Sequence, residues 1–439
     1  MTRTSLAVLG AGLLAAAMWI WVQAIAVPHQ QAESAERGAP RGNLSDLYPR
    51  WLGARELLLR GRDPYGADIT GEIQAGYYGR LLDPQRPNDP KDQQAFAYPI
   101  YVVFLLAPTV HLPFSAAHTI FFWLFVILTV LSFFLWWRTL GWRLSLAEKL
   151  IWVVLALSSF PAIQGLKLQQ LTVLVAALIA GAMFAITRRH FVFAGILLAV
   201  ATIKPQLVFL VMVWLCVWIL GNWRDRQRLL WSFAVAMLAL VAAGEALLPG
   251  WITEFRRAMA DYYRYTGGGN SVLDVVLSPI WGRIVSGLLV ALLIVFAWRI
   301  RRENEKTAAF QWALSATLAT TLLIIPMFAP YNQLLLIPGV MMAVRALRQL
   351  WEKNRLSRFF VTITGVAIGW PFFAAVVLVA ALLLLPGATV QKAWGLPFYP
   401  SFAIPITIYA LLLSSRATLC VDQPATDDPL VLRQSVASE

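Results

Sequence analysis

Two charged residues in this sequence stand where acid–base and phosphate chemistry would need them. Asp46 follows an apolar segment and precedes an arginine-rich run, where its carboxylate could take a proton from an attacking hydroxyl group. Lys204 lies between Ala-Thr-Ile and Pro-Gln-Leu-Val, and its ammonium could offset charge on a departing phosphate. Ordinary roles compete with both. Asp46 could be a helix N-cap or a solvated loop acid, and Lys204 could be a residue that snorkels from a span end.

Other polar residues have weaker claims to chemistry. Arg256, Arg257 and Arg264 could meet a phosphate or an acidic headgroup, although such runs are more often a solvated helix face. Three nearby tyrosines, within 262–265, could stack on a sugar or anchor the chain at a membrane interface. The acidic residues of 83–92 are separated by prolines, so we expect no metal site. With no Gly-rich phosphate loop, we expect neither nucleotide hydrolysis nor a cofactor.

The composition indicates the kind of chain that must position these residues. Of 439 residues, 59% are hydrophobic and 13% charged, whereas soluble domains carry roughly a quarter charged residues. Apolar runs of about twenty residues recur, and each is continuous rather than alternating, which predicts membrane-spanning helices. The net charge of +13 comes largely from short loops between these runs. It therefore indicates orientation in a membrane and not nucleic-acid binding. The two cysteines predict neither a disulfide nor a metal site.

The first span is predicted at Ser5–Val27, with Arg3 before it placing the N-terminus in the cytoplasm. A cleaved signal peptide is the competing interpretation, and the length of the apolar run favours an uncleaved anchor. Residues 28–97 then form a long first extracytoplasmic loop, which begins with a polar stretch at 28–42.

Within this loop we expect a short helix at Pro49–Arg60 that ends at Gly61. Its apolar side chains recur at helical spacing, and its arginines fall elsewhere on the helix. This pattern is typical of an interfacial helix on a membrane surface. The apolar positions are Leu47, Trp51, Ala54 and Leu58.

From residue 98 the apolar runs follow closely, and we expect an all-α bundle of about eleven to twelve transmembrane helices. Their approximate bounds are 98–113, 116–137, 148–164, 168–187, 191–220, 229–248, 280–298, 308–325, 331–347, 359–385 and 396–414. If every run crossed, the basic loops Arg138–Lys149 and Arg188-Arg189 would fall outside. The positive-inside pattern is restored if 98–113 stops short and 191–220 breaks at Lys204 into two limbs that meet near the outer face.

The rest of the chain completes one integral membrane domain, residues 1–415. Residues 249–278 form a second extracytoplasmic segment, and 416–439 a cytoplasmic, disordered tail. Both termini are therefore expected in the cytoplasm.

Several short motifs recur in an order that resembles glycosyltransferase family 87. In the first loop these are Asp46, Ala54, Leu57-Leu58, Gly61 and Pro64-Tyr65. Further along are Tyr98-Pro99, Gly165 with Gln169, Ile203-Lys204-Pro205-Gln206 and Pro330-Tyr331-Asn332-Gln333. Each motif is short, and their order carries the resemblance.

The resemblance implies a membrane enzyme of the GT-C superfamily that moves a sugar, mannose first, from a polyprenyl-phosphate carrier. Its acceptor would be a lipid or glycan on the outer face of a bacterial plasma membrane. Asp46 takes the position of the family's catalytic base. Some members carry a histidine near the start of a late span, where this chain has Tyr331-Asn332-Gln333. The substrate-binding residues expected here are Lys204, Gln206, Gln169, Arg264, Tyr331, Asn332, Gln333 and Tyr65.

Two hypotheses that assign the chain to other classes of protein stay open. A transporter of lipid or polyprenyl phosphate would also use a broken helix and an intramembrane lysine. A catalytically silent scaffold that binds a partner enzyme would account for the missing histidine.

Overall fold

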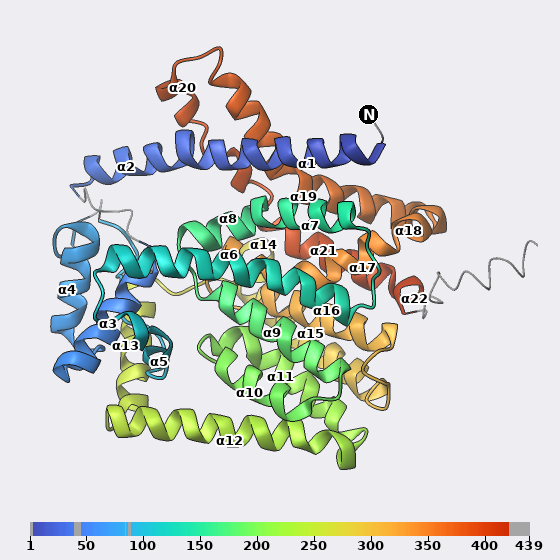
Figure 1. Cartoon of the computed structure of the whole chain (residues 1–439), viewed down its shortest axis with the longest axis horizontal. Coiled ribbons are helices and arrows are strands. Elements are labelled where there is room, and N and C mark those ends of the chain that lie inside the picture. Colours follow the sequence, from blue (N-terminus) through green and yellow to red (C-terminus); the bar gives the residue numbers. More distant parts are fainter. Residues whose placement is uncertain (1–2, 39–44, 84, 87–88, 421–439) are drawn as a thin grey trace, which may run out of the picture.

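The structure, a computed structural model, describes residues 3–38, 45–83, 85–86 and 89–420. Every regular element in these ranges is a helix, so the all-α prediction is confirmed (Figure 1). The sequence dictates this class because long apolar runs can satisfy their backbone groups within lipid only by hydrogen bonding inside each helix.

The longest helices run from one end of the molecule to the other, as Figure 1 shows for α1, α6 and α12. Their bounds are α1 (Arg3–Ile20), which continues through a π-helical turn (Trp21–Ala26) into α2 (Val27–Glu36), α6 (Phe114–Thr139) and α12 (Trp223–Leu247). The left end, called here the loop end, holds α3 (Leu47–Arg60), α4 (Ala67–Tyr78), α5 (Val102–Leu106) and α13 (Trp251–Thr266). The right end holds α18 (Leu347–Lys353) and α22 (Arg416–Leu419).

The remaining helices fill the space between the two ends. They are α7 (Leu146–Ser158), α8 (Phe160–Lys167), α9 (Thr172–Thr187), α10 (Phe191–Ala201), α11 (Pro205–Leu220), α14 (Val272–Leu277), α15 (Pro279–Arg299), α16 (Ala308–Ile324), α17 (Ile337–Arg345), α19 (Arg355–Ala381), α20 (Gly387–Gln391) and α21 (Ala403–Ser414). Short 3-10 turns complete the set at Ala107–Thr109, Pro330–Leu336 (η3) and Leu396–Phe398.

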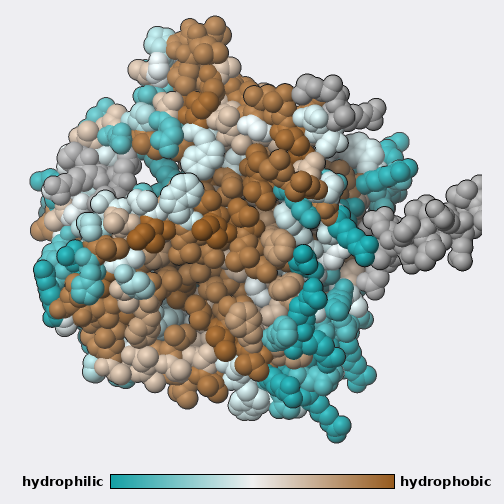
Figure 2. All heavy atoms as spheres, in the orientation of Figure 1, coloured by the Kyte–Doolittle hydropathy of each residue, from teal (hydrophilic) through white to brown (hydrophobic). Residues whose placement is uncertain are grey.

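Within the described residues, six helices are long and apolar enough to cross a membrane, and up to eight if each of two bent pairs counts as one span. Four shorter apolar helices, α9, α10, α11 and α16, accompany them. Hydrophobic residues cover the middle of the face in Figure 2, and hydrophilic residues gather at its left and right ends. The chain is therefore a polytopic membrane protein, with six to eight helices of spanning length where eleven to twelve were predicted. The difference arises in part because the predicted spans at 168–187, 191–220 and 308–325 form shorter helices.

The basic loops lie together at the end opposite the long loop, called here the basic end. Arg189 pairs with Asp225 at 2.9 Å, so the loop after α9 meets the start of α12. Arg226 donates to the Arg301 carbonyl at 2.7 Å, and Arg345 to the Leu140 carbonyl at 2.8 Å. The contacts confirm the predicted arrangement in which these loops share one side.

Two local features produce that arrangement. The run at 98–113 contains only the five-residue α5 and one 3-10 turn, so it does not cross. The run at 191–220 breaks between α10 and α11, where Pro205 opens the second limb. A proline is tolerated in the first turn of a helix but ends the helix before it.

Helix α3 confirms the short helix predicted after Asp46, and Gly61 ends it with a left-handed φ of 66°. Its apolar face was expected on the membrane surface. That expectation is wrong, because Leu47 and Ala54 are buried in the main hydrophobic core of the protein, and Trp51 is also buried. Helical periodicity shows that a face is covered, but it does not distinguish a protein neighbour from lipid.

Two segments that the sequence analysis gave as a polar stretch and a disordered tail begin with helix. The polar stretch predicted at 28–42 is helical as far as Glu36, and residues 39–44 lie outside the described part. At the other terminus the predicted tail begins with α22, where the Arg416 guanidinium lies 4.4 Å from the Phe296 ring centroid. Residues 421–439 lie outside the described part.

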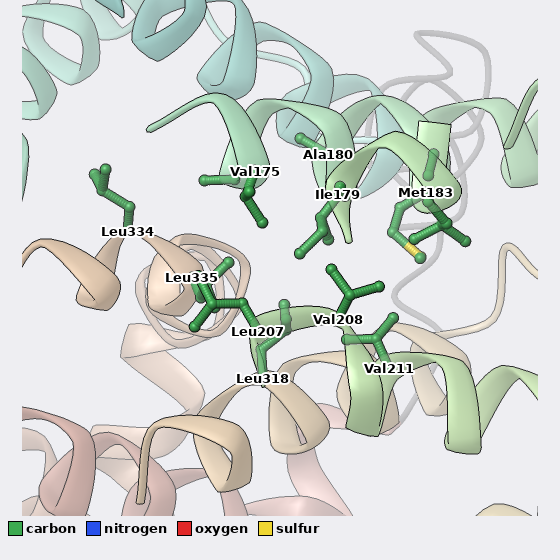
Figure 3. Packing of buried hydrophobic residues seen from close by; sticks show 14 of the residues in the cluster. Val175, Ile179, Ala180, Met183, Leu207, Val208, Val211, Leu318, Leu334 and Leu335 are labelled. Carbon is green, nitrogen blue, oxygen red and sulfur yellow. The ribbon is translucent and has the colours of Figure 1, made fainter. Parts of the chain in front are cut away.

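The framework of the site is a core made by α9, α11, α16 and η3 (Figure 3). The aliphatic side chains in Figure 3 interdigitate between these elements, which fixes their separation. They include Val175, Ile179 and Met183 from α9, Leu207, Val208 and Val211 from α11, Leu318 from α16, and Leu334 and Leu335 from η3.

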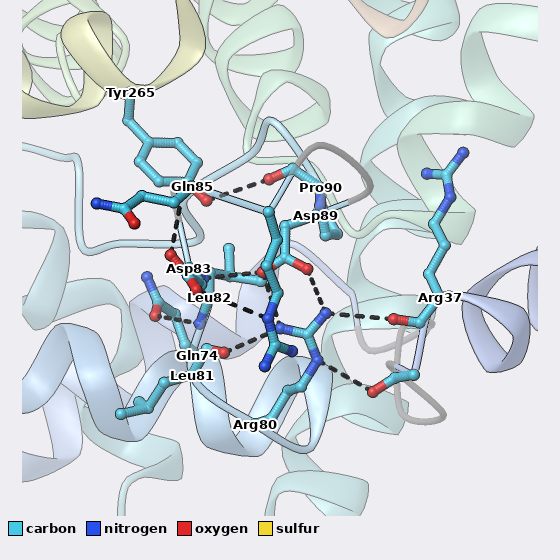
Figure 4. Close-up of polar contacts among 12 residues, drawn as sticks. Arg37, Gln74, Arg80, Leu81, Leu82, Asp83, Gln85, Asp89, Pro90 and Tyr265 are labelled. Carbon is cyan, nitrogen blue, oxygen red and sulfur yellow. Dashed lines mark hydrogen bonds and ion pairs between the residues drawn. The ribbon is translucent and has the colours of Figure 1, made fainter.

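The loop that follows α4 is held by one arginine (Figure 4). Arg80 donates to both carboxylate oxygens of Asp89, at 2.8 and 2.5 Å, and also to the carbonyl oxygens of Arg37 and Gly38 at 3.2 Å. The same Asp89 carboxylate accepts the Asp83 amide at 2.8 Å. The bidentate pair therefore ties α4, its following loop and the end of α2 together.

Candidate functional site

A tight turn after α8 places the first residues of the site. The Asp46 amide donates to the Leu168 carbonyl at 2.9 Å, and the Ser45 hydroxyl donates to the Gln169 side chain at 2.6 Å. Gln169 has a φ of 49° and also donates to the His118 carbonyl. A non-glycine residue in this conformation is strained and persists only where its surroundings hold it. The turn and the start of α3 thus fix each other.

The Asp46 carboxylate faces the site and does not cap its helix. Asp46 stands at the N-cap position of α3, yet its side chain accepts no hydrogen bond from that helix. It accepts one from the Gln170 side-chain amide instead. The N-cap explanation for Asp46 is therefore excluded.

Lys204 is buried inside the protein and does not snorkel from a span end. Only 6% of the residue is exposed, and its ammonium donates to Gln170 at 2.7 Å and to the Thr172 hydroxyl at 2.8 Å. Thr172 in turn donates to the Asn332 side-chain oxygen at 3.0 Å. Gln170 thus bridges Asp46 and Lys204 through the two ends of one amide group. Asn332 connects η3 to the same network.

Aromatic rings surround the two cations of the site. The Lys204 ammonium lies 5.0 Å from the Tyr331 ring centroid and 5.8 Å from that of Tyr98. The Arg50 guanidinium lies 4.6 Å from the Tyr98 centroid. Tyr65 donates to the Tyr98 carbonyl at 2.7 Å and so supports that ring from outside the cluster. Ring faces attract cations.

Arg50 belongs to the site, although the sequence analysis placed it only on the helix surface. It donates to the Asp46 carbonyl, and its buried Nε has no hydrogen-bond partner among the described residues. A buried guanidinium donor without a partner is unfavourable, and an anion would satisfy it. Its spacing four residues after Asp46 was the available indication, because such residues share a helix face.

Two cations, Arg50 and Lys204, and a second carboxylate, Asp92, act on Asp46. Burial raises the pKa of the Asp46 carboxyl above its ordinary 3.8, and Asp92 adds to that rise, whereas Arg50, Gln170 and Lys204 oppose it. Asp46, Arg50 and Tyr331 are only half-buried, so the cluster is accessible from outside. It combines a proton acceptor with a place for an anion.

Four of the predicted residues join this cluster directly, and the others lie elsewhere. Asp46, Lys204, Tyr331 and Asn332 come together, with Gln169 and Tyr65 holding their neighbours. The exceptions are Gln206, which is exposed, Arg264, which is exposed and paired with Asp261, and Gln333, which donates to the Ser401 carbonyl at 2.7 Å.

For some of these exceptions, a position close in sequence to a site residue did not mean a position in the cluster. Gln206 is two residues beyond Lys204, and the break before α11 turns it away from the cluster. The sequence analysis also missed Gln170 and Thr172, which only their closeness to Gln169 could have indicated. In the described part of the chain, no cluster of His, Cys, Asp or Glu could hold a metal ion.

The comparison with protein families gives one match. The family model described as glycosyltransferase family 87 matches residues 96–326, more than half of the chain. The matched range includes Gln169, Gln170 and Lys204. Asp46 and Arg50 precede it, and Tyr331 follows it. No curated protein and no solved structure matches the chain.

Proposed function

Since this chain belongs to glycosyltransferase family 87 and is a membrane glycosyltransferase, we propose that it uses a polyprenyl-phosphate-linked sugar, with mannose as the first candidate. The acceptor is a hydroxyl group of a lipid or glycan on the outer face of a bacterial plasma membrane. The loop end faces outward in this proposal, and the basic end faces the cytoplasm, in keeping with the distribution of Lys and Arg.

One observation carries the proposal: a single amide, that of Gln170, joins the Asp46 carboxylate to the Lys204 ammonium. Glycosyl transfer needs a base beside the attacking hydroxyl and a cation beside the departing phosphate. The half-buried guanidinium of Arg50 adds a second cation for that phosphate.

The proposed reaction is a direct displacement. The acceptor oxygen bonds to the anomeric carbon as the bond from that carbon to the phosphate oxygen breaks, which inverts the anomeric configuration. Asp46 takes the hydroxyl proton. Lys204 and Arg50 stabilise the negative charge that remains on the polyprenyl phosphate.

An apolar groove beside Lys204 supports a lipid-linked donor. A cavity of about 360 Å³ lies between the start of α11 and the end of α16. Its walls are mainly apolar and begin at Pro205, the residue after Lys204. A polyprenyl tail could lie there while its phosphate reaches the ammonium. The lining residues are Pro205, Gln206, Phe209, Leu210, Thr321, Ile324, Ile325 and Pro326.

The proposal is tested by transfer of radiolabelled mannose from polyprenyl-phosphate-mannose in membranes that contain wild type or Asp46→Asn. We expect Asp46→Asn to lower transfer by about 100-fold or more, the range for loss of a general base. Equal transfer by both proteins would remove Asp46 from the mechanism. No transfer by the wild type, with donor binding intact, would favour the transporter or the scaffold.

The role of Lys204 needs its own variant. Lys204→Met should weaken use of the donor, seen as a raised KM for polyprenyl-phosphate-mannose. Lys167→Met is the matched control, because it removes the same charge from the end of α8 and leaves the Gln170 contact in place. Unchanged donor dependence in Lys204→Met would assign Lys204 a purely structural role.

A further inference from the structure

A cavity lined by charged residues lies at the basic end, away from Asp46. It has a volume of about 410 Å³ and lies where α6, α9 and α17 end and α16 begins. Helix α6 connects the two regions, because the His118 carbonyl contacts Gln169 and Arg138 lines the cavity. At 1.5 Å per residue these two positions are about 30 Å apart, roughly the thickness of a hydrocarbon core.

Four cations and no carboxylate line this cavity. The cations are Arg138, Arg188, Lys306 and Arg345. Among the described residues none of the four has an acidic partner within ion-pair distance, although the neighbouring Arg189 pairs with Asp225 and Glu305. Cations gathered around one cavity without counter-charges repel each other, and a bound anion would relieve that repulsion.

The cations differ in how they are held. Arg345 is half-buried and fixed by its hydrogen bond to the Leu140 carbonyl. Arg138 and Arg188 are exposed, and each guanidinium lies near a ring of its own helix, 4.9 Å from Phe134 and 5.4 Å from Phe184. Their donors remain free to turn toward a ligand.

An ordinary explanation exists for the cations alone. Lys and Arg are common in cytoplasmic loops and stabilise helix C-termini through the helix dipole. Neither effect requires four cations to line one cavity that has no carboxylate in its wall. This arrangement indicates an anionic ligand.

We propose that this cavity is a binding site for a phosphate-bearing anion, held by Arg138, Arg188, Lys306 and Arg345. Phosphate oxygens accept several charge-assisted hydrogen bonds at once, and the planar guanidinium groups of arginine match their geometry. The phosphate belongs either to the headgroup of an anionic phospholipid or to a small soluble molecule. The site does not depend on the proposed donor or on Asp46.

The test uses the full-length protein in nanodiscs, with two arms that separate the sources of phosphate. In the first arm, nanodiscs of phosphatidylcholine receive inorganic phosphate or pyrophosphate, and binding is followed by calorimetry. In the second, phosphatidylglycerol replaces part of the phosphatidylcholine, and retained lipid is counted by native mass spectrometry. Saturable binding in either arm is expected, and the arm that responds identifies the source.

Variants locate the binding. Arg138→Gln with Arg188→Gln should weaken it about tenfold or more, since two charge-assisted contacts to the anion are lost. The matched control is Arg224→Gln with Arg302→Gln, which removes two exposed cations from the basic end outside the cavity.

Two results would overturn the proposal. One is the absence of saturable binding in both arms. The other is an equal loss of binding in the control pair, which would assign the effect to the general charge of this end. A melting temperature of each variant close to that of the wild type shows that the comparison is made between folded proteins.

Discussion

At the scale of single residues, Gln170 determines how the two charges of the site act together. Its amide nitrogen donates to Asp46, and its amide oxygen accepts from Lys204. Because both contacts use one rigid planar group, the carboxylate and the ammonium are held at a fixed spacing. Gln170 therefore acts as a positioning residue, and Asp46 and Lys204 touch the substrates in the proposed mechanism.

Gln170→Met keeps the size of this side chain and removes both contacts. We expect transfer to fall by up to about 100-fold, the loss for a catalytic group misplaced by about 1 Å. The hydrogen bond from Gln170 lowers the pKa of Asp46, so its loss raises that pKa further. The acidic limb of the pH–rate profile should therefore move to higher pH.

The control for Gln170 is Gln164→Met, a change in another buried glutamine, on α8. It should leave the position of the acidic limb unchanged. A fall in transfer for Gln170→Met with no movement of the limb would mean that Gln170 only supports the fold.

The raised pKa of Asp46 has opposite consequences for activity and for stability. A base must be ionised, so transfer should fall as the pH drops through a pKa above 3.8. Folding favours the protonated carboxyl, so the stability contribution of Asp46 is largest below 3.8 and is lost as the pH rises through the folded pKa. At pH 7, Asp46→Asn should therefore melt at or above the wild-type temperature while losing transfer. A lower melting temperature would instead attribute its lost transfer to damaged folding.

At the scale of elements, the Arg80–Asp89 pair decides how the loop after α4 is held beside α13. Asp92 in this loop accepts a hydrogen bond from Tyr262 of α13 at 3.3 Å, and Asp92 also acts electrostatically on Asp46. The prolines of the loop suggested mobility from the sequence. The ion pair supplies the order that the local sequence does not.

Asp89→Asn should loosen this loop at neutral pH. The Arg80 guanidinium lowers the pKa of Asp89 to about 2 from 3.8, so the stabilisation is present above 3.8 and is lost as the pH falls from 3.8 toward 2. Tryptic cleavage after the exposed Lys91 should become about tenfold faster at pH 8, as local opening becomes easier.

Asp83→Asn is the matched control, because the Asp83 carboxylate in the same loop is exposed and contacts only nearby residues of that loop, the Gln85 amide at 2.9 Å and Arg86 at 3.6 Å. Its cleavage rate should stay near that of the wild type. Similar acceleration in both variants would show that any lost carboxylate loosens the loop.

At the scale of the whole molecule, the loop end and the basic end should face opposite sides of the membrane. With Cys216 and Cys420 replaced, Asp68→Cys of α4 and Arg302→Cys of the basic end each provide one exposed thiol. An impermeant maleimide added to intact cells should label Asp68→Cys directly. Arg302→Cys should react only after permeabilisation, and labelling of both in intact cells would contradict the assigned orientation.

The sequence by itself determined the class of the molecule and much of its spatial order. Continuous apolar runs predicted helices, because backbone groups in lipid must hydrogen bond within their own segment. The basic loops Arg138–Lys149 and Arg188-Arg189 predicted that the run at 191–220 breaks at Lys204 into two limbs, because this break places all basic loops on one side. The contact of Arg189 with Asp225 and that of Lys204 with Gln170 agree with this prediction. Asp46 and Lys204 were identified because a charge beside apolar residues needs a partner.

Only the tertiary structure decided which polar side chains meet. Gln170 joins Asp46 to Lys204 across more than 120 residues of sequence, and no local pattern contains that pairing. The structure alone also showed that α3 packs against protein and not lipid. The sequence could not show this, because a protein neighbour and a lipid neighbour favour the same spacing of apolar residues. Partner choice is a matter of three-dimensional packing, which depends on side chains distant in the sequence. The sequence therefore determines the helices and the gathering of the basic loops at one end, and packing determines the site.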